Sequence, residues 1–222
     1  MSRADRSCGA GGEGLNRTGL RSDCLHLASI EPVFAQVLQR LGTPPLWRRP
    51  AGFRTLVQIV NEQKISLSSA RAIGERVETL CNPFTAPGFL SLPERSLRAC
   101  GMSGAKIGYC RSIAEAIVSG RLVLTRLARQ SDEEALAALV AVRGIGPWTA
   151  NVYLSMALGR RDAWPSGDRA LALGVAELFG LEAVPDYPSL DRRADAWRPC
   201  RGAAARLIWH AYLERRARAP AH

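Results

Sequence analysis

Few side chains in this sequence are placed to do chemistry. The three histidines are scattered along the chain, so their spacing indicates no zinc site. The six cysteines include no C-x-x-C pair and predict no disulfide framework; their spacing is typical of isolated buried thiols. Lys64 and Lys106 are the only lysines, and only they offer a side-chain amine as nucleophile. Asp168 stands directly before an expected helix, where its simplest role is a helix N-cap.

The most informative segment is residues 139–151, which read LVAVRGIGPWTAN. Gly144 and Gly146 can take up the positive φ of a tight turn between two helices, and neither has a side chain to keep a phosphate away. Pro147 suits the first position of the second helix. The free N–H groups and the dipole of that helix start favour an anion, and Ile145 should anchor the turn in the core. The segment predicts a phosphate-binding hairpin, with an ordinary helical hairpin as the alternative.

The elements around this hairpin are expected to be helices separated by glycine and proline. No segment alternates strictly between apolar and polar residues, so we expect an all-α fold of nine or ten helices. Residues 1–24 predict a disordered tail, and residues 25–222 predict one domain of two lobes with its hairpin at 132–158. The expected helices span residues 31–41, 53–63, 66–80, 93–101, 104–118, 132–142, 148–158, 168–179 and 202–216, and a polar loop is expected over 181–201.

The net charge of the chain indicates which class of partner it binds. Thirty basic and twenty acidic residues give a net charge of +10, which favours a polyanion; a solvated basic surface is the alternative. No run of about 18 apolar residues occurs, so we expect no membrane span. The first residues lack the apolar core of a secretory signal, which leads us to expect a cytoplasmic protein.

The hairpin and the aspartate that follows it resemble a known family. The run Gly144-Ile-Gly-Pro-Trp-Thr-Ala-Asn151, a loop, and then Pro165-Ser-Gly-Asp168 is similar to the helix-hairpin-helix DNA glycosylase superfamily, in particular to its DNA-3-methyladenine glycosylase II branch. The resemblance implies two helical lobes with a DNA cleft and a lesion pocket between them. Weaker matching segments are Asn61-Glu-Gln-Lys-Ile-Ser66, Gly101-Met-Ser-Gly-Ala-Lys106, Trp197-Arg-Pro-Cys-Arg201 and Leu207-Ile-Trp209.

The resemblance implies that Asp168 is the catalytic carboxylate. A helix start keeps such a group ionised, so this role is compatible with an N-cap. Breaking an N-glycosidic bond builds positive charge on the sugar, and a fixed carboxylate lowers that barrier and can orient the attacking water. Relatives that also cut the strand carry a lysine where this chain has Trp148, so we expect a monofunctional enzyme without lyase activity. Cys200 is the only cysteine near the C-terminus, so we expect no iron–sulfur cluster.

The expected substrate is an alkylated purine in damaged double-stranded DNA. A base must leave the stack before excision, and aromatic side chains then hold it. Trp148 and Trp209 match pocket positions of the resembled branch; Tyr153 and Trp164 are further candidates, with helix packing as their alternative role. Aromatic faces suit a cationic alkylated base. A glycosylase for deaminated or oxidised bases, or a non-catalytic hairpin that only binds DNA, are the alternative functions.

Further contacts are expected on the DNA side of the molecule. Gln63 either contacts the minor groove or pairs helices, and Lys106 either touches phosphate or caps a surface face. An apolar wedge that fills the gap left by the base is expected in the turn after residue 80, from Leu80, Pro83 or Phe84. We expect a monomer that requires no cofactor and is nucleoid-associated in a bacterium. The expected DNA-binding residues are Gly144, Ile145, Gly146, Thr149, Gln63 and Lys106, and the resemblance implies a monovalent cation on the main-chain carbonyls of Val140, Val142 and Ile145.

Overall fold

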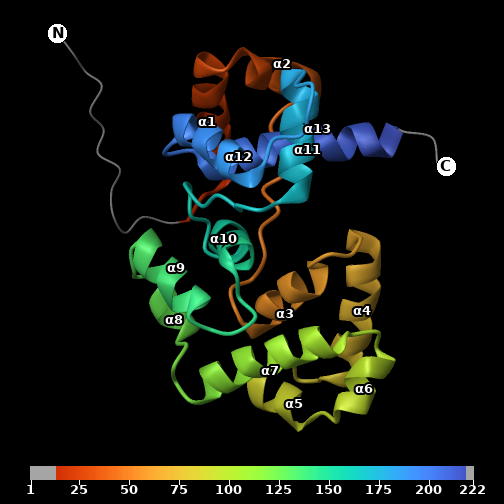
Figure 1. The fold of residues 1–222 in the computed structure, drawn as a ribbon. Coiled ribbons are helices and arrows are strands. Elements are labelled where there is room, and N and C mark those ends of the chain that lie inside the picture. Colours follow the sequence, from red (N-terminus) through yellow and green to blue (C-terminus); the bar gives the residue numbers. More distant parts are fainter. Residues whose placement is uncertain (1–13, 219–222) are drawn as a thin grey trace.

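Two hydrophobic cores organise the chain. The computed structural model describes residues 14–218, and every regular element within them is a helix, which confirms the all-α expectation. One core is built from residues between Phe53 and Ala163, and the other from the N-terminal helices together with residues 164–211. The two cores form the lower and upper lobes of Figure 1.

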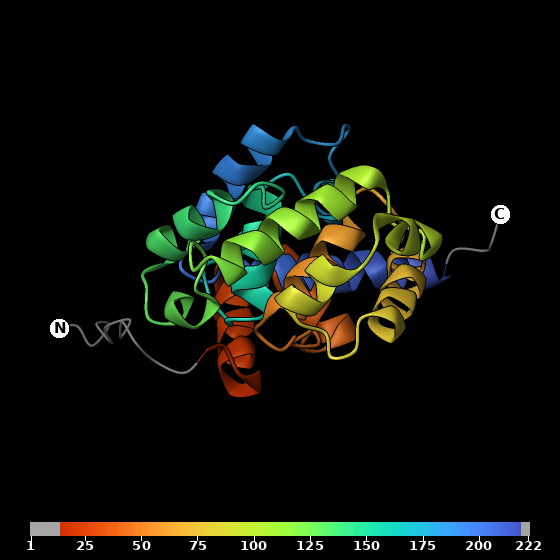
Figure 2. The same ribbon diagram turned by 90° about the horizontal axis from the view of Figure 1, so that it is seen from below.

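The lower lobe gathers seven helices around one apolar centre. Phe53, Leu56, Val57 and Val60 recur at helical spacing and are all buried, so α3 buries one full face. Helix α7 crosses this lobe and packs on both α3 and α5 (Figures 1 and 2). The helices of this lobe are α3 (Phe53–Glu62), α4 (Leu67–Leu80), α5 (Ala86–Ser91), α6 (Glu94–Ala99), α7 (Gly104–Val118), α8 (Leu124–Leu127) and α9 (Asp132–Val140).

The upper lobe joins both ends of the described chain. Helix α13 packs against α1, α2 and α11, so the last helix closes the core that the first helix opens. Gly180 ends α11 in a left-handed conformation with φ 61°, as its position after the apolar pattern predicts. The elements of this lobe are α1 (Arg17–Ile30), α2 (Pro32–Leu41), α11 (Arg169–Phe179), α12 (Tyr187–Ala194), the short 3-10 helix η1 (Asp195–Trp197) and α13 (Arg201–Arg218).

Helix α10 (Pro147–Met156) lies between the lobes (Figure 1). It packs on α9 and α3 below, while Met156 near its end contacts both cores. The capping box expected at Ser131 is present and begins α9, so α9 and α10 form the predicted hairpin. The turn of this hairpin and the start of α11 are thereby brought to the junction of the two lobes.

The structure corrects two expectations about the polar parts of the chain. The predicted tail over residues 1–24 is wrong for its second half, because α1 is capped by Asn16 and buries Leu20 and Cys24; residues 1–13 lie outside the described part. The predicted loop over 181–201 contains α12 and η1. Among residues 14–218, none of the helices is both long and apolar enough to span a lipid bilayer.

Candidate active site

The carboxylate of Asp168 is held by three N–H donors at the start of α11. Its Oδ1 accepts a hydrogen bond from the backbone N–H of Leu171 at 2.8 Å, which is the expected N-cap. Its Oδ2 accepts from the indole N–H of Trp148 at 2.8 Å, and Oδ1 also accepts from the indole N–H of Trp209 at 3.3 Å. Donors on both oxygens fix the orientation of the carboxylate and stabilise its negative charge, as does the helix start.

These two tryptophans come from different lobes. Trp148 belongs to the first turn of α10 and packs, half-buried, on the lower core, while Trp209 lies in α13 and is buried in the upper core. Asp168 is 9% exposed, so the residue is largely buried but retains some contact with solvent. The arrangement places one fixed negative charge, bordered by two indole rings, at the junction of the lobes.

The hairpin turn has the expected local structure at Gly144, Ile145 and Pro147, whereas Gly146 differs from the expectation. Gly144 has φ 96°, and a Cβ on it would lie 2.4 Å from the Cβ of Tyr109, so this glycine is required by the fold. Gly146 has φ −84° instead of the expected positive value, and a Cβ there would meet open space. Ile145 is buried and anchors the turn, as predicted, so only its main chain can reach DNA. Pro147 is at N1 as expected, and no side chain caps the start of α10, whose first-turn N–H groups have no partner within the helix.

Three side chains expected to contact DNA are used inside the protein. The Gln63 amide donates to the Thr149 hydroxyl at 2.9 Å and to the Gly144 carbonyl at 3.5 Å, which is the helix-pairing alternative. The Thr149 side chain is 1% exposed and therefore faces the core. The Lys106 amine donates to the carbonyl of Asn61 at 2.7 Å, and burial lowers the pKa of this amine.

Comparison with known proteins decides the family. The family model described as "HhH-GPD superfamily base excision DNA repair protein" matches residues 57–199, which include the hairpin, Asp168 and parts of both lobes. The chain belongs to this family. Within it, DNA-3-methyladenine glycosylase 1 of Schizosaccharomyces pombe is 29% identical over 199 residues, covering 86% of this chain and 87% of that protein.

Two solved structures of the same family share the fold. One is the S. pombe 3-methyladenine DNA glycosylase Mag1 in complex with abasic DNA, with a TM-score of 0.80 and 27% identity, covering 85% of this chain and 95% of that one. The other is a DNA-3-methyladenine glycosidase from Bacillus halodurans, with a TM-score of 0.74 and 29% identity, covering 88% and 91% of the two chains. The predicted membership of the helix-hairpin-helix glycosylases is therefore confirmed.

Of the four aromatic residues expected in the pocket of this HhH-GPD protein, two lie elsewhere. Tyr153 is fully buried in the lower core, where its hydroxyl accepts from the N–H of Gly52 at 3.0 Å. Trp164 is buried in the upper core, 5.7 Å from the Trp197 ring, and its indole N–H donates to Asp191. Both side chains are therefore packed in a core, which is the helix-packing alternative. The sequence could not decide this, because apolar spacing does not distinguish a core aromatic from one that lines a cleft.

The structure also shows tertiary neighbours of the site and of the hairpin that the sequence did not predict. Trp47, in the connection between α2 and α3, has φ 46° and meets the Trp209 ring edge to face at 6.3 Å between centroids. The bond from Gln63 sets the exposed turn of Lys64 and Ile65 beside the hairpin. Phe84, one expected wedge, packs instead in a cluster with Phe53 and Phe89. No sequence pattern indicates these tertiary neighbours.

Proposed function

We propose that this protein excises alkylated purines, of the 3-methyladenine type, from damaged double-stranded DNA by hydrolysing the N-glycosidic bond. The observation that carries the proposal is the Asp168 carboxylate, held by Trp148 and Trp209 at the junction of the lobes. The printed names of its relatives support the same substrate class. A module that only binds DNA has no use for a carboxylate in this position, because it would repel phosphate.

Each part of the site has a task in this reaction. The open space at Gly146 and the first-turn N–H groups of α10 bind the DNA backbone next to the lesion. The extruded base lies against the two indoles, whose faces attract a positively charged alkylpurine. Asp168 then faces the deoxyribose, stabilises its developing positive charge and accepts a hydrogen bond from the attacking water. An alkylated base is a good leaving group, so no side chain has to protonate it.

The hairpin carbonyls fit a monovalent cation. Val140 is the last residue of α9, where a helix leaves carbonyl oxygens without partners, and Val140, Val142 and Ile145 line one hollow at the turn. The Val142 carbonyl accepts from the Ile145 N–H at 3.0 Å and retains a second lone pair. A cation bound there would supply positive charge next to the DNA phosphate.

We further propose that the reaction ends at the abasic site without strand cleavage. The first turn of α10 presents the Trp148 indole, which has no amine to attack the sugar. The Lys106 amine is bound to a carbonyl, whereas Lys64 is exposed on the turn beside the hairpin. Both lysines therefore belong in the test of this proposal.

The experiment uses duplexes that each carry one lesion: an alkylated purine, hypoxanthine or 8-oxoguanine. The proposal predicts strand breaks at the alkylated purine only after alkali, and no protein–DNA adduct after borohydride reduction. Breaks without alkali, together with an adduct lost in Lys64→Ala or Lys106→Ala, would contradict the absence of lyase activity. Excision of hypoxanthine or 8-oxoguanine alone would contradict the substrate class.

A further inference from the structure

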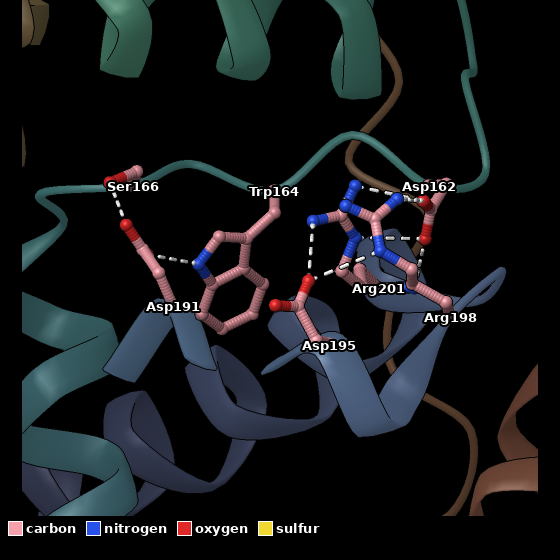
Figure 3. A network of polar contacts seen from close by, with 7 residues as sticks. All are labelled: Asp162, Trp164, Ser166, Asp191, Asp195, Arg198 and Arg201. Atoms are coloured by element: carbon pink, nitrogen blue, oxygen red, sulfur yellow. Dashed lines mark hydrogen bonds and ion pairs between the residues drawn. The ribbon is translucent and has the colours of Figure 1, made fainter. Parts of the chain in front are cut away.

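The loop that carries Asp168 is tied to a helix that takes no part in the site described above. Asp191 lies in α12, and one of its carboxylate oxygens accepts the indole N–H of Trp164 at 2.8 Å. The other accepts the hydroxyl of Ser166 at 2.5 Å. Figure 3 shows Asp191 below this loop, with one bond directed up to Ser166 and the other directed sideways to the indole of Trp164.

These two bonds hold the turn at residues 164–168 on both sides of Pro165. The N–H of Ser166 donates to the carbonyl of Trp164, and the N–H of Asp168 donates to the carbonyl of Pro165 at 3.2 Å. Gly167 completes the turn with φ 84°. Because Asp191 fixes residues 164 and 166, it fixes the residue between them, whose carbonyl holds the main chain of Asp168.

A second anchor lies on the same connection. The carboxylate of Asp162 accepts from Arg198 at 2.7 Å and from Arg201 at 2.8 Å, so the start of the loop is tied to the residue after η1 and to the first residue of α13 (Figure 3). This leaves residues 163–167 dependent on the Asp191 bonds and on the packing of Trp164 for their position relative to the upper lobe.

The contacts of Asp191 are separate from those of the reacting carboxylate. Asp191, Trp164 and Ser166 line an open pocket of about 490 Å³ between α9, α10 and α12, and Asp168, Trp148 and Trp209 are not among its lining residues. We infer that Asp191 is a positioning residue for excision, which acts through Trp164 and Ser166 to set the place of Asp168. This inference rests on the proposed glycosylase function.

The test compares Asp191→Ala with Asp191→Asn. The alanine removes both acceptors, whereas the asparagine can accept from Trp164 and donate to the Ser166 hydroxyl, so it keeps both bonds. We expect Asp191→Ala to lower the single-turnover excision rate by roughly 10- to 100-fold, because small misplacements of a reacting group have effects of this size. Affinity for a duplex with an abasic analogue should change less than about threefold, and Asp191→Asn should recover most of the rate.

Asp186→Ala is the matched control on the same helix. Asp186 caps α12 by accepting from the N–H of Ser189, so its loss frays the helix without removing either bond of Asp191. We expect this variant to lose stability while its excision rate stays near that of the wild type. Equal rate losses in Asp186→Ala and Asp191→Ala, in proportion to their losses in melting temperature, would overturn the inference, as would a wild-type rate in Asp191→Ala.

Amide hydrogen exchange gives a readout that does not depend on activity. The N–H of Asp168 and the N–H of Leu171 should exchange faster in Asp191→Ala than in Asp186→Ala, because both bonds depend on the place of the loop. Unchanged exchange at Asp168 would overturn the positioning role. A wild-type protein that excises no lesion would refute the proposed function instead, and exchange would still decide the role of Asp191.

Discussion

The two indoles that hold Asp168 are not equivalent donors. The Trp148 bond is 2.8 Å long and reaches Oδ2 alone, whereas the Trp209 bond is 3.3 Å long and shares Oδ1 with the N-cap bond of Leu171. A short bond to a charged acceptor is the stronger interaction. Trp148 should therefore contribute more than Trp209 to the orientation of the carboxylate.

Substitution of each indole by phenylalanine tests this difference. Loss of a hydrogen bond to a charged group is worth about 1.5–3 kcal/mol, so Trp148→Phe should lower the single-turnover excision rate by roughly 10- to 100-fold. Trp209→Phe should lower it by less than about 10-fold, since Oδ1 keeps its bond to Leu171. A larger loss in Trp209→Phe than in Trp148→Phe, measured on the same alkylated duplex, would contradict this ranking.

Prediction from the sequence was most successful for individual residues next to a turn or a cap. Asp168, Pro147 and the capping box at Ser131 are set by local chemistry, and all three take up the expected local structure. Gln63 and Tyr153 depend on neighbours far away in the chain, so periodicity could not place them. Whether the carboxylate and the indoles act as proposed remains a prediction.

The hairpin element requires its two glycines for different reasons. In Gly144→Ala the new methyl group would overlap Tyr109 at a φ of 96°, so the variant should lose about 2 kcal/mol or more of unfolding free energy. In Gly146→Ala the methyl group points into open space at an ordinary φ, so stability should change by less than about 0.5 kcal/mol.

Gly146→Ala should differ from the wild type in its affinity for DNA. The methyl group of Gly146→Ala would occupy the space that we assign to a phosphate, so affinity for an abasic-analogue duplex should fall by about tenfold. Urea unfolding and fluorescence anisotropy measure the two quantities. Unchanged affinity in Gly146→Ala would contradict the role of the turn in binding the backbone.

Three elements meet at the buried side chain of Arg206 in α13. Its guanidinium donates to the hydroxyl and carbonyl of Ser155 in α10 and to the carbonyl of Leu46 in the connection between α2 and α3. Arg206→Ala leaves these buried acceptors unpaired and should lower the unfolding free energy by about 3–5 kcal/mol, measured in urea. The exposed Arg71→Ala should change it by less than about 1 kcal/mol, and similar losses in both variants would contradict this account.

Helix prediction failed for α1 and α12, whose apolar patterns are interrupted or weak. In α1 the side chain of Asp23 is buried and pairs with Arg161. The sequence does not show this distant partner, so a charged residue on the buried face made the segment resemble a disordered tail. Helix α12 buries only Leu190 and Ala194, which gives too weak a periodic pattern. Helices α3, α7 and α13 lie close to their predicted bounds.

At the scale of the whole molecule, the net charge of +10 predicts salt-dependent binding to DNA. Each phosphate that is neutralised releases counterions, so about four contacts should weaken affinity by roughly 100-fold between 50 and 200 mM salt. Abasic-analogue and undamaged duplexes should show similar slopes, because phosphate contacts do not depend on sequence. An affinity that stays constant over this range would exclude a binding mode dominated by the backbone.

The joining of both lobes at one carboxylate is the central claim, and Asp168→Asn tests it most directly. The amide keeps the size of the side chain and its Oδ1 acceptor for Leu171, but it removes the negative charge. Single-turnover excision of an alkylated purine should fall by at least about 100-fold, while the affinity for an abasic-analogue duplex stays within about threefold of wild type. Excision at the wild-type rate by Asp168→Asn would contradict the account.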